Sequence, residues 1–177
     1  MIRSGVPFYA FFGLGWLLAG VGHLGGTATG VAGMLGLVIA LSLVLAARRL
    51  SQARAGGVGQ PLSPLKRRQF GQVNAAQWFL IAAIATGCVA GGARGLIMPL
   101  VAVVVGLHFL PLARVFGDLR LAVPGAILTA IGLAGLLART ANASPGTVFT
   151  LVGVGCALTL WSTAAWSLAG VTRAART

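Results

Sequence analysis

The feature that most constrains this chain is a series of six long runs of apolar residues. A helix needs about 20 apolar residues to cross about 30 Å of hydrocarbon, and each run is close to that length. Backbone groups in lipid must be hydrogen-bonded within their own segment, which favours helices, and no run alternates like a barrel strand. The sequence therefore predicts an all-α, polytopic integral membrane protein, a single transmembrane domain of six helices. The expected spans are residues 6–22, 28–47, 73–92, 96–113, 119–138 and 147–171.

The composition agrees with a membrane location. Of the 177 residues, 58% are hydrophobic and 8% are charged, whereas about a quarter of the residues of a soluble domain are charged. The six runs leave little chain for an extramembrane domain. The longest connector, residues 48–72, contains Gly56, Gly57, Pro61 and Pro64. We expect it to be a basic cytoplasmic loop with at most a short surface helix.

The basic residues predict an orientation. Thirteen Lys and Arg residues stand against one acidic residue. A cytoplasmic N-terminus puts eleven of them on the cytoplasmic side and only Arg94 and Arg139 on the other, as the positive-inside rule requires. Both termini are therefore expected in the cytoplasm. Because the charges lie in short loops between apolar runs, we expect no nucleic-acid partner.

The same charges offer a lipid contact. A basic cluster beside the membrane attracts acidic headgroups by about 1 kcal/mol per residue. The alternative is that these residues only fix the topology. The residues expected to meet anionic lipids at the cytoplasmic face are Arg48, Arg49, Lys66, Arg67 and Arg68.

The scarcity of acidic side chains excludes several kinds of chemistry. Asp118 is the only acidic residue, which excludes paired-carboxylate catalysis and carboxylate-ligated metal sites. Cys88 and Cys156 both lie inside apolar runs and form no CxxC motif. His23 and His108 differ in depth by more than about 10 Å, so one chain cannot clamp a haem between them. We therefore expect no catalytic residues, metal or cofactor, and a non-enzymatic protein is favoured over an enzyme.

Two of the predicted helices carry small residues at every fourth position, which places them on one face. Such stripes allow close helix contact in lipid. Packing within the bundle is the favoured interpretation, and a homo-oligomer interface is the alternative. The stripes are Ala32, Gly36 and Ala40 in the second run, and Ala126, Ala130, Ala134 and Ala138 in the fifth. Similar Gly-His and Gly-Cys placements in the two halves also raise the possibility of two inverted three-helix halves, as in many transporters.

Polar residues at membrane depth gather in the third and fourth runs. The short turn at 93–95 makes these helices antiparallel neighbours, so Gln77 and His108 should lie within about one helical turn in depth. Pro111 disrupts the last turn of the fourth helix. We predict an inward-facing polar pocket lined by Asn74, Gln77, Trp78, His108 and Asp118.

This pocket has two interpretations. Ionisable groups inside a membrane usually mark a pathway or a ligand. Alternatively, His108 hydrogen-bonds to Gln77 or to a backbone carbonyl and only fixes one helix against another. Asp118 is more simply paired with Arg114 or Arg120 in the adjoining loop than used in catalysis.

The segments Asn74-Ala-Ala-Gln77-Trp78 and Leu107-His-Phe-Leu-Pro-Leu-Ala113 carry a resemblance to a known group. They resemble small bacterial multi-helix membrane proteins described only as domains of unknown function, with a His-Phe-x-Pro segment in a central helix. The resemblance covers the third and fourth helices, about a quarter of the chain. It implies a bacterial inner-membrane location and draws attention to His108. It implies no activity.

The sequence leaves three functions open. The first is a small transporter or binding protein that takes a neutral or amphipathic solute past His108 and Gln77, because no acidic pair exists for proton coupling. The second is a membrane-embedded redox subunit that binds a quinone-type lipid ligand. The third is a structural accessory subunit.

Overall fold

The computed structural model describes residues 2–52 and 63–173, and this part of the chain contains helices and no strand. The all-α prediction is therefore confirmed. The helices are α1 (Ile2–Val21), α2 (Gly26–Gln52), α3 (Pro64–Ala90), α4 (Ile97–Phe116), α5 (Ala122–Thr140) and α6 (Pro145–Arg173). Short 3₁₀ helices, η1 (Arg94–Leu96) and η2 (Leu119–Leu121), precede α4 and α5.

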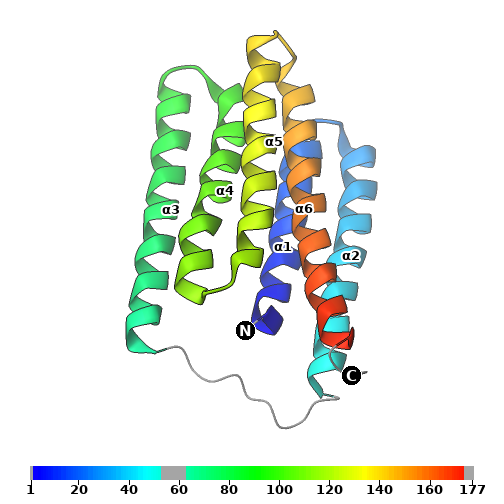
Figure 1. The fold of residues 1–177 in the computed structure, drawn as a ribbon. Helices are drawn as coiled ribbons and strands as arrows, with labels where there is room; N and C mark the ends of the chain where they lie inside the picture. The colour runs from blue at the N-terminus through cyan, green and yellow to red at the C-terminus, as the bar shows by residue number, and fades with distance from the viewer. Residues whose placement is uncertain (1, 53–62, 174–177) are drawn as a thin grey trace.

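Five helical segments of the described chain are long and apolar enough to cross a membrane. The exception is α1, whose apolar part, Gly5–Val21, is shorter. The structure is thus that of a multi-pass helical membrane protein. The helices run alternately up and down, with the start of α1 and the end of α6 at the same end of the bundle (Figure 1).

The prediction of a loop over residues 48–72 is wrong at both of its ends. Helix α2 continues to Gln52, and α3 begins at Pro64 with Ser63 as its N-cap, whose hydroxyl accepts the Lys66 backbone N–H at 3.4 Å. Pro64 suits this position because the first helical residue needs no N–H. Polar and basic residues with good helix propensity carry both helices beyond their apolar segments, so hydropathy alone underestimates their length. Residues 53–62 lie outside the described part.

The helices form a row in which α3 and α2 occupy the two edges (Figure 1). Along this row α3 packs on α4, α4 on α5, α5 on α6, α6 on α1 and α1 on α2, with further contacts of α6 to α2 and α4. Within the described chain, α3 packs on no helix except α4. The last three helices therefore form a packed unit while the first three do not, and inverted three-helix halves find no support in the packing.

The closest helix crossings are made by glycines. A Cβ added to Gly20 of α1 would lie 2.8 Å from the Gly153 Cα of α6. A Cβ on Gly106 of α4 would lie 2.5 Å from the Thr129 backbone nitrogen of α5, and one on Gly132 would lie 2.7 Å from the Pro99 carbonyl oxygen. Side chains at these positions would push backbones apart, so the glycines set the helix spacing.

The core lies where α1, α4, α5 and α6 meet. Val6, Leu128, Val152 and Leu160 are fully buried there. The Trp161 indole Nε1–H of α6 donates to the Ala10 carbonyl of α1 at 3.0 Å, which satisfies the one polar atom of a large buried side chain. Helix α3 reaches this core through Ile81, which is partly buried against it.

Candidate functional site

The contact between α3 and α4, here called the seam, is built around a polar side chain. Gln77 is the only buried residue of α3 and, at 6% exposed, the only buried polar residue in the described chain. Apolar side chains elsewhere on α3, such as Phe79, point away from the protein. Since apolar burial contributes little to helix association in lipid, a polar residue at the one protected position of α3 is the notable feature of the seam.

His108 enters the seam from α4. The residue is half-buried, and the Val73 backbone of α3 is a polar neighbour of its imidazole. Val73 lies four residues, one helical turn, before Gln77 and shares its face of α3. A Phe70–Phe116 ring contact at 5.9 Å fixes the same antiparallel register nearer the helix ends. The structure therefore brings Gln77 and His108 to one interface at similar depth.

The two side chains are satisfied unequally. His108 has the Val73 backbone as a polar neighbour. The Gln77 amide forms no hydrogen bond to any residue of the described chain. Among the described residues only the Arg139 Nε is a fully buried unpaired side-chain atom, so the Gln77 amide keeps some accessible surface and is open to a hydrogen-bonding partner.

Pro111 adds a second unsatisfied group. Helix α4 continues through Pro111 to Phe116 and ends where Gly117 adopts a left-handed conformation with φ 67°. Proline has no backbone N–H, so the Leu107 carbonyl four residues earlier loses its helical donor. Pro111 shares the face of α4 that carries His108, three residues away. The Leu107 carbonyl on this turn of α4 is therefore available to another donor.

Asn74 and Trp78, two further residues of the predicted pocket, differ in burial. Asn74 is half-buried on the turn of α3 preceding Gln77 and makes no side-chain hydrogen bond within the described chain. Trp78 is 54% exposed and lies beside the seam on the outer surface. Both lie on α3 within one helical turn of Gln77, as their spacing in the sequence predicts.

Asp118 does not join them. Its carboxylate accepts the Arg120 backbone N–H at 3.1 Å and so caps η2. Its charge reaches the Tyr9 side chain of α1, and no hydrogen bond or ion pair links it to Gln77 or His108. The expected pairing with Arg114 or Arg120 side chains is also wrong, because the described residues form no ion pair. A carboxylate two residues before a free backbone N–H satisfies it locally instead.

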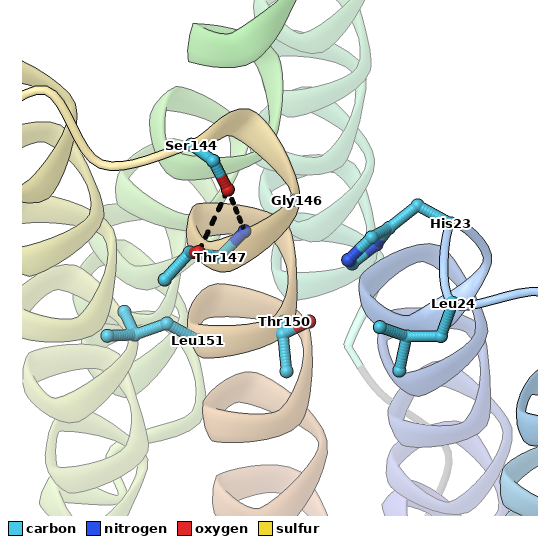
Figure 2. A pocket seen from close by; sticks show the side chains of 7 residues that line it. All are labelled: His23, Leu24, Ser144, Gly146, Thr147, Thr150 and Leu151. Carbon is cyan, nitrogen blue, oxygen red and sulfur yellow. Dashed lines mark hydrogen bonds between the residues drawn. The ribbon is translucent and has the colours of Figure 1, made fainter.

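Two cavities of the structure lie away from the seam. The larger, about 540 Å³, opens between the end of α1 and the start of α6 (Figure 2). His23 stands on one side of it, facing Gly146 and Thr150, and the Ser144 hydroxyl accepts the Thr147 backbone N–H at 3.1 Å on the other. This is the N-cap of α6. The smaller cavity, about 280 Å³, lies between α1 and α2 and includes Pro7 and Arg48.

The two small-residue stripes behave differently. In α2, Gly36 and Ala40 are buried and Ala32 is half-buried, so this stripe packs within the bundle. In α5 the expected packing is wrong, because the alanines face outward and the glycines of the helix make the contacts instead. Ala126, Ala130 and Ala134 are exposed, Ala138 is half-buried, and Gly125, Gly132 and Gly135 are buried against α4 and α6.

The basic residues collect at one end of the bundle, here called the basic end, where α1 begins and α6 ends. Their side chains are exposed and free of ion pairs within the described chain. At the opposite end, Arg139 is half-buried and its guanidinium donates to the Ala143 carbonyl, which fastens the α5–α6 turn. The described residues of the basic end are Arg48, Arg49, Lys66, Arg67, Arg68, Arg114 and Arg120.

No protein-family model, curated protein or solved structure matches this chain. The function must therefore be argued from the seam itself, and the resemblance of its two segments to a bacterial membrane family stays a prediction.

Proposed function

We propose that this protein binds a small neutral or amphipathic molecule in the seam between α3 and α4 of a six-span bundle in a bacterial inner membrane. The observation that carries the proposal is the Gln77 side chain, which is 6% exposed and whose amide has no hydrogen-bond partner in the described chain. A ligand that paired with this amide would add hydrogen bonds, each with a net contribution of about 0.5–1.5 kcal/mol.

The charges of the seam favour a neutral ligand. The one acidic residue, Asp118, is occupied in capping η2, so no carboxylate is available to balance a cation beside Gln77. An unpaired charge at membrane depth is costly. A molecule with polar, uncharged groups fits better.

The position of α3 connects binding to transport. Because α4 is the one α-helix of the described chain on which α3 packs, and α3 touches the core through Ile81, α3 can move with little disturbance of the core of α1, α4, α5 and α6. Displacement of α3 by a ligand would open the seam along its length, which is a simple route for moving a solute. Transport is the consequence we expect of binding at this place.

The basic end is proposed to face the cytoplasm. Seven described basic side chains are exposed there, against Arg94 and Arg139 at the other end, as the positive-inside rule requires. Anionic lipid headgroups would then meet Arg48, Arg49, Lys66, Arg67 and Arg68. The same topology requires α1 to be the sixth span, with α2 and α6 covering its sides.

Crosslinking with an uncharged amphiphile tests the site. Protein in lipid nanodiscs is irradiated with a dodecanol that carries a diazirine in its tail, and the labelled peptides are identified by mass spectrometry. We expect adducts concentrated on α3 and α4 around Gln77 and His108, suppressed by excess dodecanol and lost in Gln77→Leu. The control is Gln72→Leu, an exposed position on the same helix, which should label like the wild type. Labelling spread evenly over all lipid-facing helices, unchanged by Gln77→Leu, would contradict the proposal.

A quinone-type ligand is the second candidate. Trp78, exposed beside Gln77, offers an aromatic face to a ring headgroup. Organic extraction of the gently purified protein would then yield a quinone in stoichiometric amount, absent from the Gln77→Leu variant.

A further inference from the structure

We propose that the ligand of the seam is a hydroxyl-bearing amphiphile, an alcohol or a phenol, which enters sideways from the bilayer. The inference rests on the proposed function and adds the chemical class of the ligand and its route. It follows from counting the hydrogen-bond donors and acceptors that the seam leaves free.

His108 contributes an acceptor. The Val73 backbone is the polar neighbour of His108 on α3, and its N–H is used inside that helix, so the imidazole would turn its own N–H to the Val73 carbonyl. A neutral imidazole has one N–H, and its other nitrogen accepts. With its donor spent on Val73, the ring has only an acceptor to offer a ligand.

Leu107 contributes a second acceptor. Its carbonyl lacks a helical donor because residue 111 is proline. The Gln77 amide contributes the only donor group together with a third acceptor, its own carbonyl oxygen. The seam thus presents three acceptor groups and one donor group. A ligand that only accepts, such as a ketone or an ether, would leave most of them unpaired, whereas a hydroxyl group both donates and accepts.

The flanks of the seam are apolar. Phe79 of α3 is 73% exposed, and Trp78 beside it and Leu107 and Leu110 of α4 are also exposed. In a bilayer these side chains meet lipid tails, and the two cavities described above lie elsewhere. A molecule that reaches Gln77 therefore approaches through lipid, with its apolar tail against these side chains and its hydroxyl group between the helices.

A matched pair of probes tests the ligand class. Binding of 4-dodecylphenol and of its methyl ether, 4-dodecylanisole, is measured to the protein in nanodiscs and to empty nanodiscs. The two share tail and ring and differ in the donated hydrogen. We expect saturable binding of the phenol about tenfold tighter than that of the ether, one donated hydrogen bond at about 1.4 kcal/mol per tenfold.

Pro111→Ala tests the freed carbonyl. The substitution supplies an N–H to Leu107 and removes one acceptor from the seam. We expect phenol binding to weaken about fivefold while binding of the ether stays unchanged, with a thermal midpoint equal to or above that of the wild type. Pro7→Ala, which changes a proline inside α1 away from the seam, is the control and should alter neither affinity.

The outcomes separate this inference from the proposed function. Equal affinities for phenol and ether, both abolished by Gln77→Leu, would overturn the hydroxyl class and leave binding in the seam intact. An affinity difference that survives Pro111→Ala unchanged would overturn the role of the Leu107 carbonyl. If neither probe binds saturably, or if Gln77→Leu changes nothing, the seam is not a binding site and the proposed function fails with the inference.

Discussion

The contacts that join α1 to α6 and α4 to α5 differ in composition from the contact between α3 and α4. The α1–α6 and α4–α5 crossings consist of glycines and fully buried apolar side chains. The seam between α3 and α4 buries a single residue of α3, and that residue is a glutamine with an unpaired amide. In lipid, affinity between helices comes from close packing and satisfied polar groups rather than from apolarity. The crossings are closely packed, whereas the seam contains a polar group, the Gln77 amide, that is not hydrogen-bonded within the described chain.

This difference indicates that the two kinds of helix contact have different roles. The crossings hold α1, α4, α5 and α6 as a rigid frame, and α3 is attached to that frame along one side. Because the polar contact between α3 and α4 is incomplete, a ligand that completes it would change how α3 packs on α4. The predictions below test the frame first and the seam last.

The largest effect is expected at the α1–α6 crossing. A Cβ on Gly20 would meet the backbone of Gly153 at 2.8 Å, and backbone cannot move aside as a side chain can. Gly20→Leu should therefore lower the free energy of unfolding by about 3 kcal/mol or more, the upper range for overpacking. The measurement is thermal unfolding in detergent. Gly87→Leu, on α3 where nothing lies within 4 Å of the added Cβ, is the control and should unfold near the wild-type temperature.

A smaller effect separates the two stripes of small residues. Ala40 of α2 is 0% exposed, whereas Ala130 of α5 is exposed. Ala40→Leu should destabilise the protein by about 1–3 kcal/mol, and Ala130→Leu should leave the thermal midpoint of the isolated chain nearly unchanged. Comparable losses for both would mean that the outer face of α5 is covered, as a homo-oligomer would cover it, and the mass of the detergent complex would then show more than one copy.

The Trp161–Ala10 hydrogen bond provides the next test of the frame. Trp161→Phe keeps a ring in the core and removes the Nε1–H that pairs with the Ala10 carbonyl. The expected loss is about 1–2 kcal/mol, from one lost hydrogen bond and a smaller ring in the core, because the Ala10 carbonyl keeps its helical donor in α1. Trp166→Phe, at an exposed position on the same helix, serves for comparison and should lose almost nothing. Equal midpoints for the two variants would argue against a role for this bond.

The number and order of the helices could be predicted because the length of an apolar run is set by the thickness of the membrane. The helix ends could not be predicted. Hydropathy ends the second apolar run at Ala47 and begins the third at Val73, whereas α2 continues through polar residues to Gln52 and α3 already begins at Pro64. Helix length beyond the bilayer depends on caps and propensity rather than on apolarity.

Which face of a helix packs was predictable for α2 and not for α5. In a soluble protein the exposed face is polar, but in lipid both faces are apolar, so alanines at 126, 130 and 134 and glycines at 125, 132 and 135 are equally plausible contacts. The glycines prevail because they allow a closer approach of backbones, as between Gly125 and Gly106.

The candidate site was predictable in part, for a geometric reason. A short turn between antiparallel helices fixes the depth of each residue relative to the neighbouring helix, and this predicts Gln77 and His108 at one interface, where His108 has Val73, one turn before Gln77, as its neighbour. Asp118 lies beyond the end of α4, where loop conformation decides its partner, and it caps η2 instead. The carbonyl freed by Pro111 could be predicted from a proline inside an apolar run, and the structure adds that α4 stays helical on both sides of that proline.

The smallest change in stability is expected at Gln77, and its sign distinguishes the seam from the frame. Gln77→Leu removes an amide without a hydrogen-bond partner and replaces it with an apolar side chain of similar size, so the protein without added amphiphile should become more stable, by at most about 1 kcal/mol. Thermal unfolding without added amphiphile measures this gain, and Gln72→Leu at an exposed position should show none. The same variant should lose the binding of 4-dodecylphenol, so stability and binding move in opposite directions. A glutamine that served only to hold α3 against α4 would instead cost stability when removed, as Trp161 does in the frame, and a lower midpoint for Gln77→Leu would therefore assign the residue to packing.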